Sequence, residues 1–375
     1  MNNPHHATPS GKARARALSV PFDGEPGPNN AITDVAGVEV GYCTVVRGDG
    51  PLVAGQGPVR TGVTAILPRG RGDVASHVFA ASHSLNGCGE LTGTLWIEES
   101  GICEGPVTIT NTHACGVARD ATLRWLIERH PDVDQRWHLP VAGETYDGEL
   151  NDINGFHVTP AHVYEALESA HGGAIELGSV GGGTGMICYD FKGGSGSASR
   201  LLTIEGESYT LGAFVQANFG LRRELVVAGV PVGRHITGGE LRGTPAGSVI
   251  AVIATDAPLL PHQLKRLARR VGLGLARSGA IAHNGSGDIF LAFSTANRDA
   301  FAAASGPRRA AFLPNERLDP LFEAVVQATD EAVIDAMVAN ETMVGRDGNT
   351  AIALPHDRLR ELLAHYGRGP DSAGG

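Results

Sequence analysis

The sequence Gly247-Ser248-Val249-Ile250-Ala251-Val252-Ile253-Ala254-Thr255-Asp256 joins a polar loop to a run of apolar residues. The loop covers residues 238–247 and contains glycine and proline, and the run that follows is nearly continuous and rich in β-branched residues. Such a run is typical of a strand that is covered on both faces. We therefore expect a buried strand over Val249–Ala254, with the hydroxyl of Ser248 at its mouth.

The dipeptide Gly-Ser occurs five times, so context must decide which copy matters. The copy at Gly178 runs into the glycine-rich segment 181–185, which cannot build a central strand because glycine brings no side chain to pack and no restricted backbone. The copies at Gly194 and Gly196 are expected in a Gly/Ser loop. Among the five, only the copy at Gly247 precedes a buried-strand pattern.

Size and cysteine content bound the class of protein. The 375 residues suffice for one large domain with a substantial core. The five cysteines are an odd number without a close Cys-X-X-Cys pair, which argues against a disulfide framework and a thiolate zinc site. Residues 1–16 lack the apolar core of a signal peptide, and no stretch reaches the ~18 apolar residues of a membrane helix. We expect a soluble cytoplasmic protein with no membrane partner.

The charge argues against nucleic acid as a partner. The formal net charge is −10, and the basic residues form only short pieces such as Lys265-Arg266 and Arg269-Arg270. These residues alternate with leucines at helical spacing, so we interpret them as the solvated face of an amphipathic helix.

The predicted elements favour stacked sheets covered by helices. Strands are expected at 38–45, 61–67, 92–97, 108–111, 210–218, 225–230, 249–254 and 289–294. Helices are expected at 118–129, 161–170, 261–278 and 319–338, the last with Asp319 as N-cap and Pro320 as first residue. The order lacks the strict βαβ rhythm of a doubly wound fold. No convincing linker divides the chain; the loop 237–247 is interpreted as a processing segment, and the tails 1–16 and 367–375 as frayed.

The Gly247-Ser248 bond has a chemistry of its own. The Ser248 hydroxyl can attack the Gly247 carbonyl, and hydrolysis of the resulting ester leaves Ser248 at a new N-terminus. Glycine helps because no Cβ blocks the approach. The released α-amine, with an ordinary pKa of ~7.7 to 8.0, is a base near neutral pH. A plain loop-to-strand junction remains the alternative for this dipeptide by itself.

Further polar residues occupy positions that suit such a site. Ser286 and Asp288 precede an apolar strand and lie two residues apart, so in an extended segment they can hold an ammonium group together; a turn is the alternative. Asn218 ends a buried-looking strand, where its amide can stabilise an oxyanion or close the strand into a turn. Glu144 and Tyr146 share one face of an extended segment and can receive an amine and an oxyanion, or form an exposed loop.

Six short motifs follow one another along the chain: Asn29-Asn30-Ala31-Ile32-Thr33-Asp34-Val35-Ala36-Gly37-Val38, Gly178-Ser179-Val180-Gly181-Gly182-Gly183-Thr184-Gly185-Met186, Asn218-Phe219-Gly220, Gly247-Ser248-Val249-Ile250, Ala254-Thr255-Asp256-Ala257-Pro258-Leu259 and Asn284-Gly285-Ser286-Gly287-Asp288-Ile289. Together they make the chain similar, over nearly its whole length, to the DmpA/β-aminopeptidase family of self-processing serine aminopeptidases.

This resemblance implies an α/β fold, a four-layer αββα sandwich similar to N-terminal nucleophile hydrolases but differently connected. It implies a single domain over 1–375 that is cut into a large fragment, 1–247, and a small fragment, 248–375. The two fragments are expected to stay together and to form a homo-oligomer of such αβ heterodimers.

The resemblance also implies roles for single residues. Ser248 would be the nucleophile, Ser286 and Asp288 the partners of its amine, and Asn218 and Tyr146 the oxyanion donors. Glu144 would bind the free amino group of a small peptide, amide or ester. No metal or other cofactor is implied.

Family members that favour β-amino acids often carry Glu where this chain has Asp288. The expected subtype is therefore an L-aminopeptidase with D-amino acid amidase or esterase activity. A β-aminopeptidase and an acyltransferase of the same chemical style are the alternatives.

Two rival sites are weaker. A phosphate site in 178–185 would lack both the GxGxxG pattern and the lysine of a phosphate loop. A metal site would have to gather His83, Cys88, His113 and Cys115, whose spacing is irregular.

Overall fold

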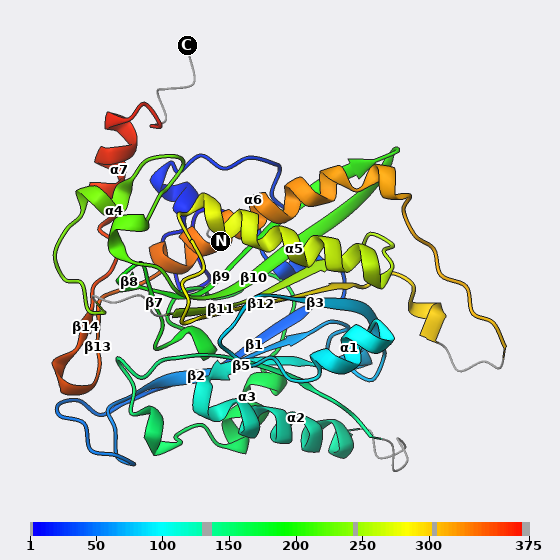
Figure 1. The fold of residues 1–375 in the computed structure, drawn as a ribbon, viewed down its shortest axis with the longest axis horizontal. Coiled ribbons are helices and arrows are strands. Elements are labelled where there is room, and N and C mark those ends of the chain that lie inside the picture. Colours follow the sequence, from blue (N-terminus) through cyan, green and yellow to red (C-terminus); the bar gives the residue numbers. More distant parts are fainter. Residues whose placement is uncertain (1–2, 130–136, 243–246, 302–305, 370–375) are drawn as a thin grey trace.

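Two β-sheets lie face to face in the computed structural model, and helices cover the outer face of each sheet (Figure 1). The structure describes residues 3–129, 137–242, 247–301 and 306–369. One sheet has four strands in the order β1-β2-β5-β6, and the other has six in the order β4-β3-β12-β11-β10-β9. The four-layer αββα sandwich expected from the sequence is confirmed.

The strand pairs are antiparallel except for β5 with β6 and β11 with β12, which are parallel. The four-stranded sheet contains β1 (Glu39–Arg47), β2 (Val59–Leu67), β5 (Val107–Asn111) and β6 (Val141–Thr145). The six-stranded sheet contains β3 (Val78–Gly87), β4 (Ile102–Cys103), β9 (Gly194–Ile204), β10 (Glu207–Asn218), β11 (Gly247–Thr255) and β12 (Ser286–Ser294). Two small hairpins are formed by β7 (Ile187–Cys188) with β8 (Phe191–Lys192) and by β13 (Met343–Val344) with β14 (Thr350–Ala351).

The helices form the two outer layers. Helices α2 (Cys115–Arg129) and α3 (Pro160–Glu168) pack on the four-stranded sheet, whereas α5 (Pro261–Arg277) and α6 (Asp319–Val338) pack on the six-stranded sheet. The remaining α-helices of the described residues are α1 (Thr94–Ser100), α4 (Val232–His235) and α7 (His356–His365). Helix α6 begins at Asp319 itself, so Leu318, and not Asp319, is its N-cap.

Strand β11 is buried on both faces, as its continuous apolar sequence predicts. Its side chains alternate between two separate clusters because successive residues of a strand point to opposite faces. Val249, Ala251 and Ile253 pack toward α5 and α6. Ile250, Val252 and Ala254 pack toward the four-stranded sheet. Full burial of each valine or isoleucine contributes about 1.5–3 kcal/mol, which holds the start of β11 firmly in the centre of the molecule.

Two predicted strands are wrong. Residues 94–100 form helix α1, because Gly93 and Gly101, at φ +75° and +72°, cap a single short helix at both ends. Residues 225–230 form a turn closed by one bridge between Val227 and Val230, with Ala228 at φ +49°.

The expected Gly/Ser loop at Gly194 and Gly196 is also wrong, since both residues lie in β9. Helix α6 crosses this strand so closely that a Cβ on Gly196 would lie 1.9 Å from the carbonyl oxygen of Ala332. The small residues therefore allow close packing of helix on sheet.

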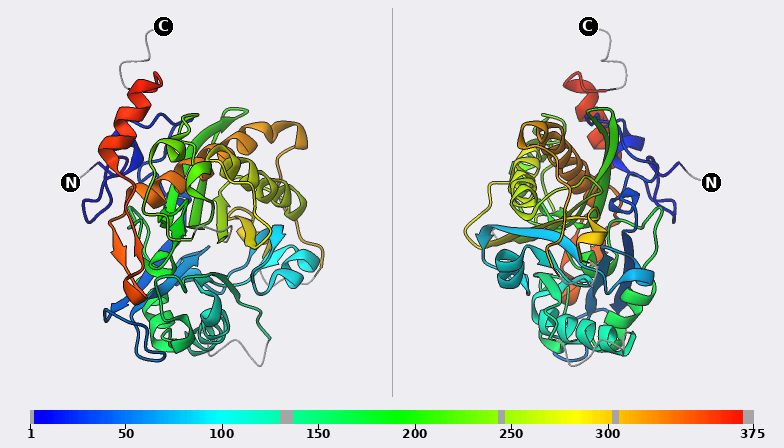
Figure 2. Two further views of the ribbon diagram at one scale, coloured as in Figure 1. Left: turned by 60° about the vertical axis from the view of Figure 1, so that its left-hand side comes forward. Right: turned by 90° about the vertical axis from the view of Figure 1, so that its right-hand side faces the viewer.

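The N-terminal tail is docked, contrary to the prediction that it frays. Arg14 forms a buried ion pair of 2.6 Å with Asp335, and Arg16 forms one of 2.6 Å with Glu331. Both acidic residues belong to α6, and Figure 2 shows the N-terminal segment against the body of the molecule near α7. At the other end, residues 370–375 lie outside the described part.

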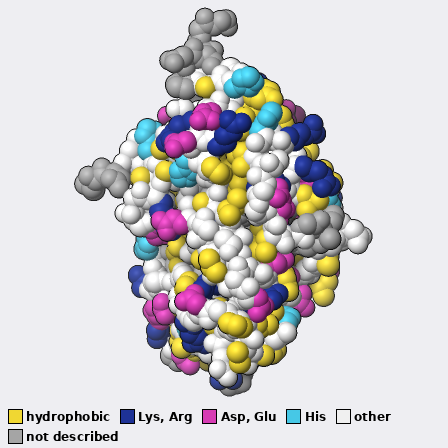
Figure 3. Space-filling model, turned by 90° about the vertical axis from the view of Figure 1, so that its left-hand side faces the viewer, with side chains coloured by type: hydrophobic (Ala, Val, Ile, Leu, Met, Phe, Trp, Pro, Cys, Tyr) yellow, Lys and Arg dark blue, Asp and Glu magenta, His cyan; other side chains and the backbone are white. Residues whose placement is uncertain are grey.

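The surface mixes charges of both signs. On the face drawn in Figure 3, basic and acidic side chains lie side by side among apolar ones. Such a face lacks the single-sign field that steers a polyanion. Within the described residues, no helix is long and apolar enough to cross a membrane.

Candidate active site

A cavity of about 470 Å³ opens at the start of β11. It brings together four residues singled out in the sequence, Ser248, Asn218, Tyr146 and Glu144. Its other lining residues are Cys88, Gly89, Glu90, Thr112, Glu149, Arg242, Gly247 and Gly285.

Ser248 is buried, with 3% of its surface exposed. By the alternation of β11 its side chain lies on the same face as Ile250, toward the four-stranded sheet. Gly247, which precedes it, packs so tightly that a Cβ would lie 2.7 Å from the carbonyl oxygen of Asn218 and 2.7 Å from the Cα of Phe219. Only glycine fits there without a shift of the backbone.

Two N–H donors point at the Ser248 hydroxyl oxygen. The side-chain nitrogen of Asn218 lies 3.3 Å from Ser248 Oγ, and the backbone nitrogen of Tyr146 lies 3.4 Å from it. Both contacts are long for hydrogen bonds. Donors of this kind stabilise negative charge that develops on a nearby oxygen.

The Asn218 amide has a fixed orientation. Its Oδ1 accepts hydrogen bonds from the Ile187 backbone at 2.9 Å and from Arg242 Nη2 at 2.6 Å. Its Nδ2 donates to the Tyr146 carbonyl at 2.8 Å as well as to Ser248. With both donors on the oxygen, the NH₂ group must face the serine.

Arg242 is a site residue that sequence reasoning missed. Its side chain is 2% exposed and also forms an ion pair of 3.0 Å with Glu149. The Gly/Pro loop around it gives no periodic pattern that would indicate burial. A buried arginine in a polar loop becomes recognisable only when its partners on β10 and after β6 are known.

Glu144 places a carboxylate at another side of the cavity. It lies near the end of β6 and is 3% exposed. One carboxylate oxygen accepts from the Glu90 backbone at 2.9 Å, and the other accepts from the Thr112 hydroxyl. Burial raises the pKa of Glu144, while these hydrogen bonds oppose the rise. The acidic side chains of Glu90 and Glu144 make this side of the cavity suited to a cation.

Tyr146 contributes through its backbone. Its N–H is the group near Ser248, whereas its phenol is folded against Gly148, where a Cβ would lie 2.3 Å from the phenol oxygen. The ring is 42% exposed and lines the cavity. The sequence pattern allows the phenol to bind an oxyanion, and since the ring lines the cavity this role stays a prediction.

Ser286 and Asp288 approach Ser248 along the backbone. The parallel register pairs Gly247 with Ser286 and Ser248 with Gly287. Ser286 Oγ donates to Asp288 Oδ1 at 2.7 Å, and both residues are 2% exposed. The turn precedes them at 284–285, and the strand begins at Ser286.

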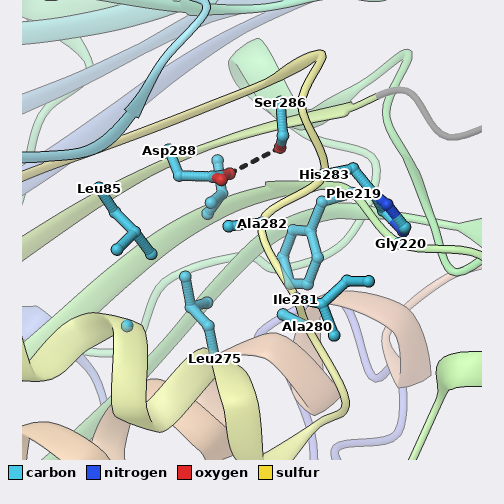
Figure 4. A pocket seen from close by; sticks show the side chains of 12 residues that line it. Leu85, Phe219, Gly220, Leu275, Ala280, Ile281, Ala282, His283, Ser286 and Asp288 are labelled. Carbon is cyan, nitrogen blue, oxygen red and sulfur yellow. Dashed lines mark hydrogen bonds between the residues drawn. The ribbon is translucent and has the colours of Figure 1, made fainter.

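The side chains of this pair lie on the helix-facing side of β12, opposite the face that carries the Ser248 hydroxyl. Phe290, two residues after Asp288, packs into the helix-side cluster, while Ile289 packs between the sheets. Burial raises the pKa of Asp288, and the Ser286 hydrogen bond opposes the rise. The pair lines a second cavity, shown in Figure 4.

The structure describes the residues of both rival sites. Residues 181–183 form a short 3-10 helix packed against strands of both sheets. A Cβ on Gly182 would lie 2.5 Å from the Ile109 carbonyl oxygen, so these glycines serve close packing. Within the described residues, no group of three or more His, Cys, Asp or Glu side chains is arranged to hold a metal.

Comparison with known proteins gives consistent matches over most of the chain. The model of peptidase family S58 matches residues 30–351. The β-peptidyl aminopeptidase BapA of Sphingosinicella microcystinivorans is 51% identical over 371 residues, covering 95% of this chain and 93% of that protein.

Solved structures of two aminopeptidases are among those that share the fold. That of the L-aminopeptidase D-Ala-esterase/amidase of Ochrobactrum anthropi, described as a variant of the Ntn hydrolase fold, superposes with a TM-score of 0.90 at 48% identity, covering 95% of this chain and 99% of that chain. A β-aminopeptidase of a Burkholderia species superposes with a TM-score of 0.84 at 44% identity, covering 94% and 98%.

Proposed function

The chain belongs to peptidase family S58 and is a hydrolase of the aminopeptidase class, and on this premise we propose that it processes itself and uses Ser248 as its nucleophile. The observation that carries the proposal is the position of the Ser248 hydroxyl at 3.3 Å from Asn218 Nδ2 and 3.4 Å from the Tyr146 nitrogen. Gly247 supports the proposal as well. Only glycine fits at this position, because the backbone there lies close to Asn218 and Phe219.

In self-cleavage, Ser248 Oγ attacks the Gly247 carbonyl carbon and its proton passes to the Ser248 nitrogen as the C–N bond breaks. Water then hydrolyses the ester, which leaves a carboxylate on Gly247 and a free hydroxyl and α-amine on Ser248. The products are the large fragment 1–247 and the small fragment 248–375.

In turnover, Glu144 binds the ammonium group of the substrate and so fixes its carbonyl near Ser248. The α-amine of Ser248 takes the proton from Oγ as the hydroxyl attacks, and the leaving amine or alcohol receives that proton. Asn218 Nδ2 and the Tyr146 N–H donate to the oxyanion. Ser286 and Asp288 hold the α-ammonium between these steps, and water releases the acyl group.

The substrates we propose are small peptides, amides and esters with a free amino terminus. Ochrobactrum anthropi L-aminopeptidase D-Ala-esterase/amidase supports an L-aminopeptidase with D-amino acid esterase and amidase activity. The 51% identical β-peptidyl aminopeptidase supports specialisation for β-amino acids as the second candidate. Parallel rates on L-Ala, D-Ala and β-Ala p-nitroanilides decide between them, and product analysis with an added amine acceptor tests acyl transfer.

Assembly and compartment are also proposals. We expect a homo-oligomer of two-fragment protomers. The five cysteines are free, which supports a reducing compartment such as the cytoplasm.

Intact mass spectrometry under denaturing conditions tests the central claim. The wild-type protein should give two fragments that divide between Gly247 and Ser248, and Ser248→Ala should give one chain without activity. An uncut wild-type chain, or an active Ser248→Ala variant, would overturn the proposal.

A further inference from the structure

A second cavity of about 220 Å³ lies on the helix-facing side of β11 and β12, behind the proposed nucleophile. In Figure 4 the side chains of Leu85, Leu275 and Phe219 converge on it from three elements, with the Ser286–Asp288 pair at its inner end. The Ser248 hydroxyl belongs to the other cavity, on the opposite face of the sheet.

The inner end of this cavity carries an unsatisfied carboxylate oxygen. Asp288 is 2% exposed, and its Oδ1 accepts from Ser286. Its Oδ2 is buried and has no hydrogen-bond partner among the residues that the structure describes. The nearby imidazole of His283 is engaged with Glu224 at 3.0 Å. A buried carboxylate oxygen left without a donor is costly, so before the proposed α-ammonium of Ser248 is formed this end of the cavity favours a group that brings N–H donors and positive charge.

The walls and mouth of the cavity are apolar. Leu275 and Phe219 are buried, whereas Leu85 and Ile281 are 48% and 66% exposed and lead from the surface into the cavity. Leu85 is the extra residue of a β-bulge, because Asp288 pairs with Asn86 and the next residue pairs with Ser84. A bulge redirects a side chain, and here it turns an apolar one to the cavity mouth.

We propose that this cavity binds a small hydrophobic primary amine, with the ammonium group on Asp288 and the hydrocarbon part among Leu85, Leu275 and Phe219. An apolar cavity of about 150 Å³ accommodates benzene, so 220 Å³ has room for a benzene ring with an aminomethyl arm. Charge and shape thus select one class of ligand.

Binding of such an amine inhibits the enzyme, a consequence that rests on the proposed function. The ligand ammonium and the α-ammonium of Ser248 compete for the same carboxylate, and loss of that partner misplaces the base. Because the ligand and the substrate occupy opposite faces of the sheet, inhibition is non-competitive with substrate. Hydrolysis of a hydrophobic amide releases an amine of this class, so the cavity provides feedback by the leaving group.

The test uses benzylamine as the probe and benzyl alcohol as its uncharged control. Calorimetric titration of the single-chain Ser248→Ala protein should detect benzylamine and find benzyl alcohol at least about tenfold weaker, because the alcohol lacks the charge-assisted bond. Wild-type kinetics should show a lower kcat with unchanged KM.

A substitution in helix α5 tests where the ligand binds. Gly272 lines the cavity, and a Cβ there would meet only the flexible end of Leu85, at 3.2 Å. Gly272→Leu fills the cavity and should weaken benzylamine binding and inhibition at least about tenfold, with basal activity retained. Gly272→Ala adds a single methyl group and should retain most of the binding.

Each outcome bears on one claim. Absence of binding to Ser248→Ala overturns the cavity assignment, and so does inhibition that is competitive and unaffected by Gly272→Leu. Binding that leaves wild-type kcat unchanged overturns the regulatory role. Binding to a wild-type protein that remains uncut supports the cavity while the proposed function fails.

Discussion

Arg242 donates a 2.6 Å hydrogen bond to the amide oxygen of Asn218, and thereby ties the loop that precedes the Gly247-Ser248 bond to the residue that faces the Ser248 hydroxyl. Hydrogen bonds to a charged donor are about twice as strong as neutral ones. The arginine therefore positions Asn218 without touching the reacting atoms.

Replacing Arg242 should act on turnover. Arg242→Ala frees the amide to rotate, so we expect kcat to fall about 10- to 100-fold with a smaller change in KM, as when an oxyanion donor is impaired. Steady-state kinetics of the matured protein measure this. Arg346→Ala is a matched control, since Arg346 bonds the Gly148 carbonyl nearby and not Asn218. Equal losses in both variants would refute a specific role for Arg242.

A methyl group on the residue before the nucleophile should impair maturation. In Gly247→Ala the new Cβ would lie 2.7 Å from the Asn218 oxygen, so the bond must shift away from its aligned position. We expect cleavage to be at least about tenfold slower. Gel electrophoresis of samples taken at intervals after synthesis measures its rate. Gly116→Ala, where a Cβ meets open space, should mature like the wild type.

Glu144 should determine recognition of the substrate amine. Glu144→Gln keeps the shape but removes the charge, so kcat/KM for an aminoacyl p-nitroanilide should fall about 10- to 100-fold. The exposed Glu98→Gln serves as control. An equal rate for Glu144→Gln and the wild type would place the amine elsewhere.

The pH dependence of stability should report Asp147, which is fully buried beside the site. Burial raises its pKa from 3.8 to about 7, against opposing hydrogen bonds from Thr61 and Asn151. A carboxyl with a raised pKa in the folded state stabilises the fold below its unfolded pKa, and this contribution is lost as the pH rises through about 7.

Urea denaturation of single-chain Ser248→Ala between pH 4 and pH 9 measures this effect. Complete loss of the Asp147 contribution lowers the free energy of unfolding by about 4 kcal/mol. Adding Asp147→Asn should flatten the profile, and an unchanged slope would mean that other groups cause it.

The sequence predicts the parts of the fold whose residues have a regular pattern. The β-branched run of β11 and the polar residue ending β10 are both local signals, and they lead to Ser248 and Asn218. Strand β9 was missed because its glycines and serines are explained only by the contact with α6. Arg242 was missed for the same reason. Its partners are distant in the chain, and no periodic pattern in the sequence indicates them.

The strand order of the larger sheet determines whether the two proposed fragments can exchange between molecules. After the proposed cut, β11 and β12 of the small fragment would remain threaded between β10 and β3 of the large fragment, with Arg14 and Arg16 clamped on α6. Fragments interleaved in this way cannot exchange partners without unfolding. In a cell that makes both wild-type protein and an inactive variant, each small fragment would keep the large fragment it was synthesised with. The population would then contain active and inactive protomers, and no protomer would combine fragments from both.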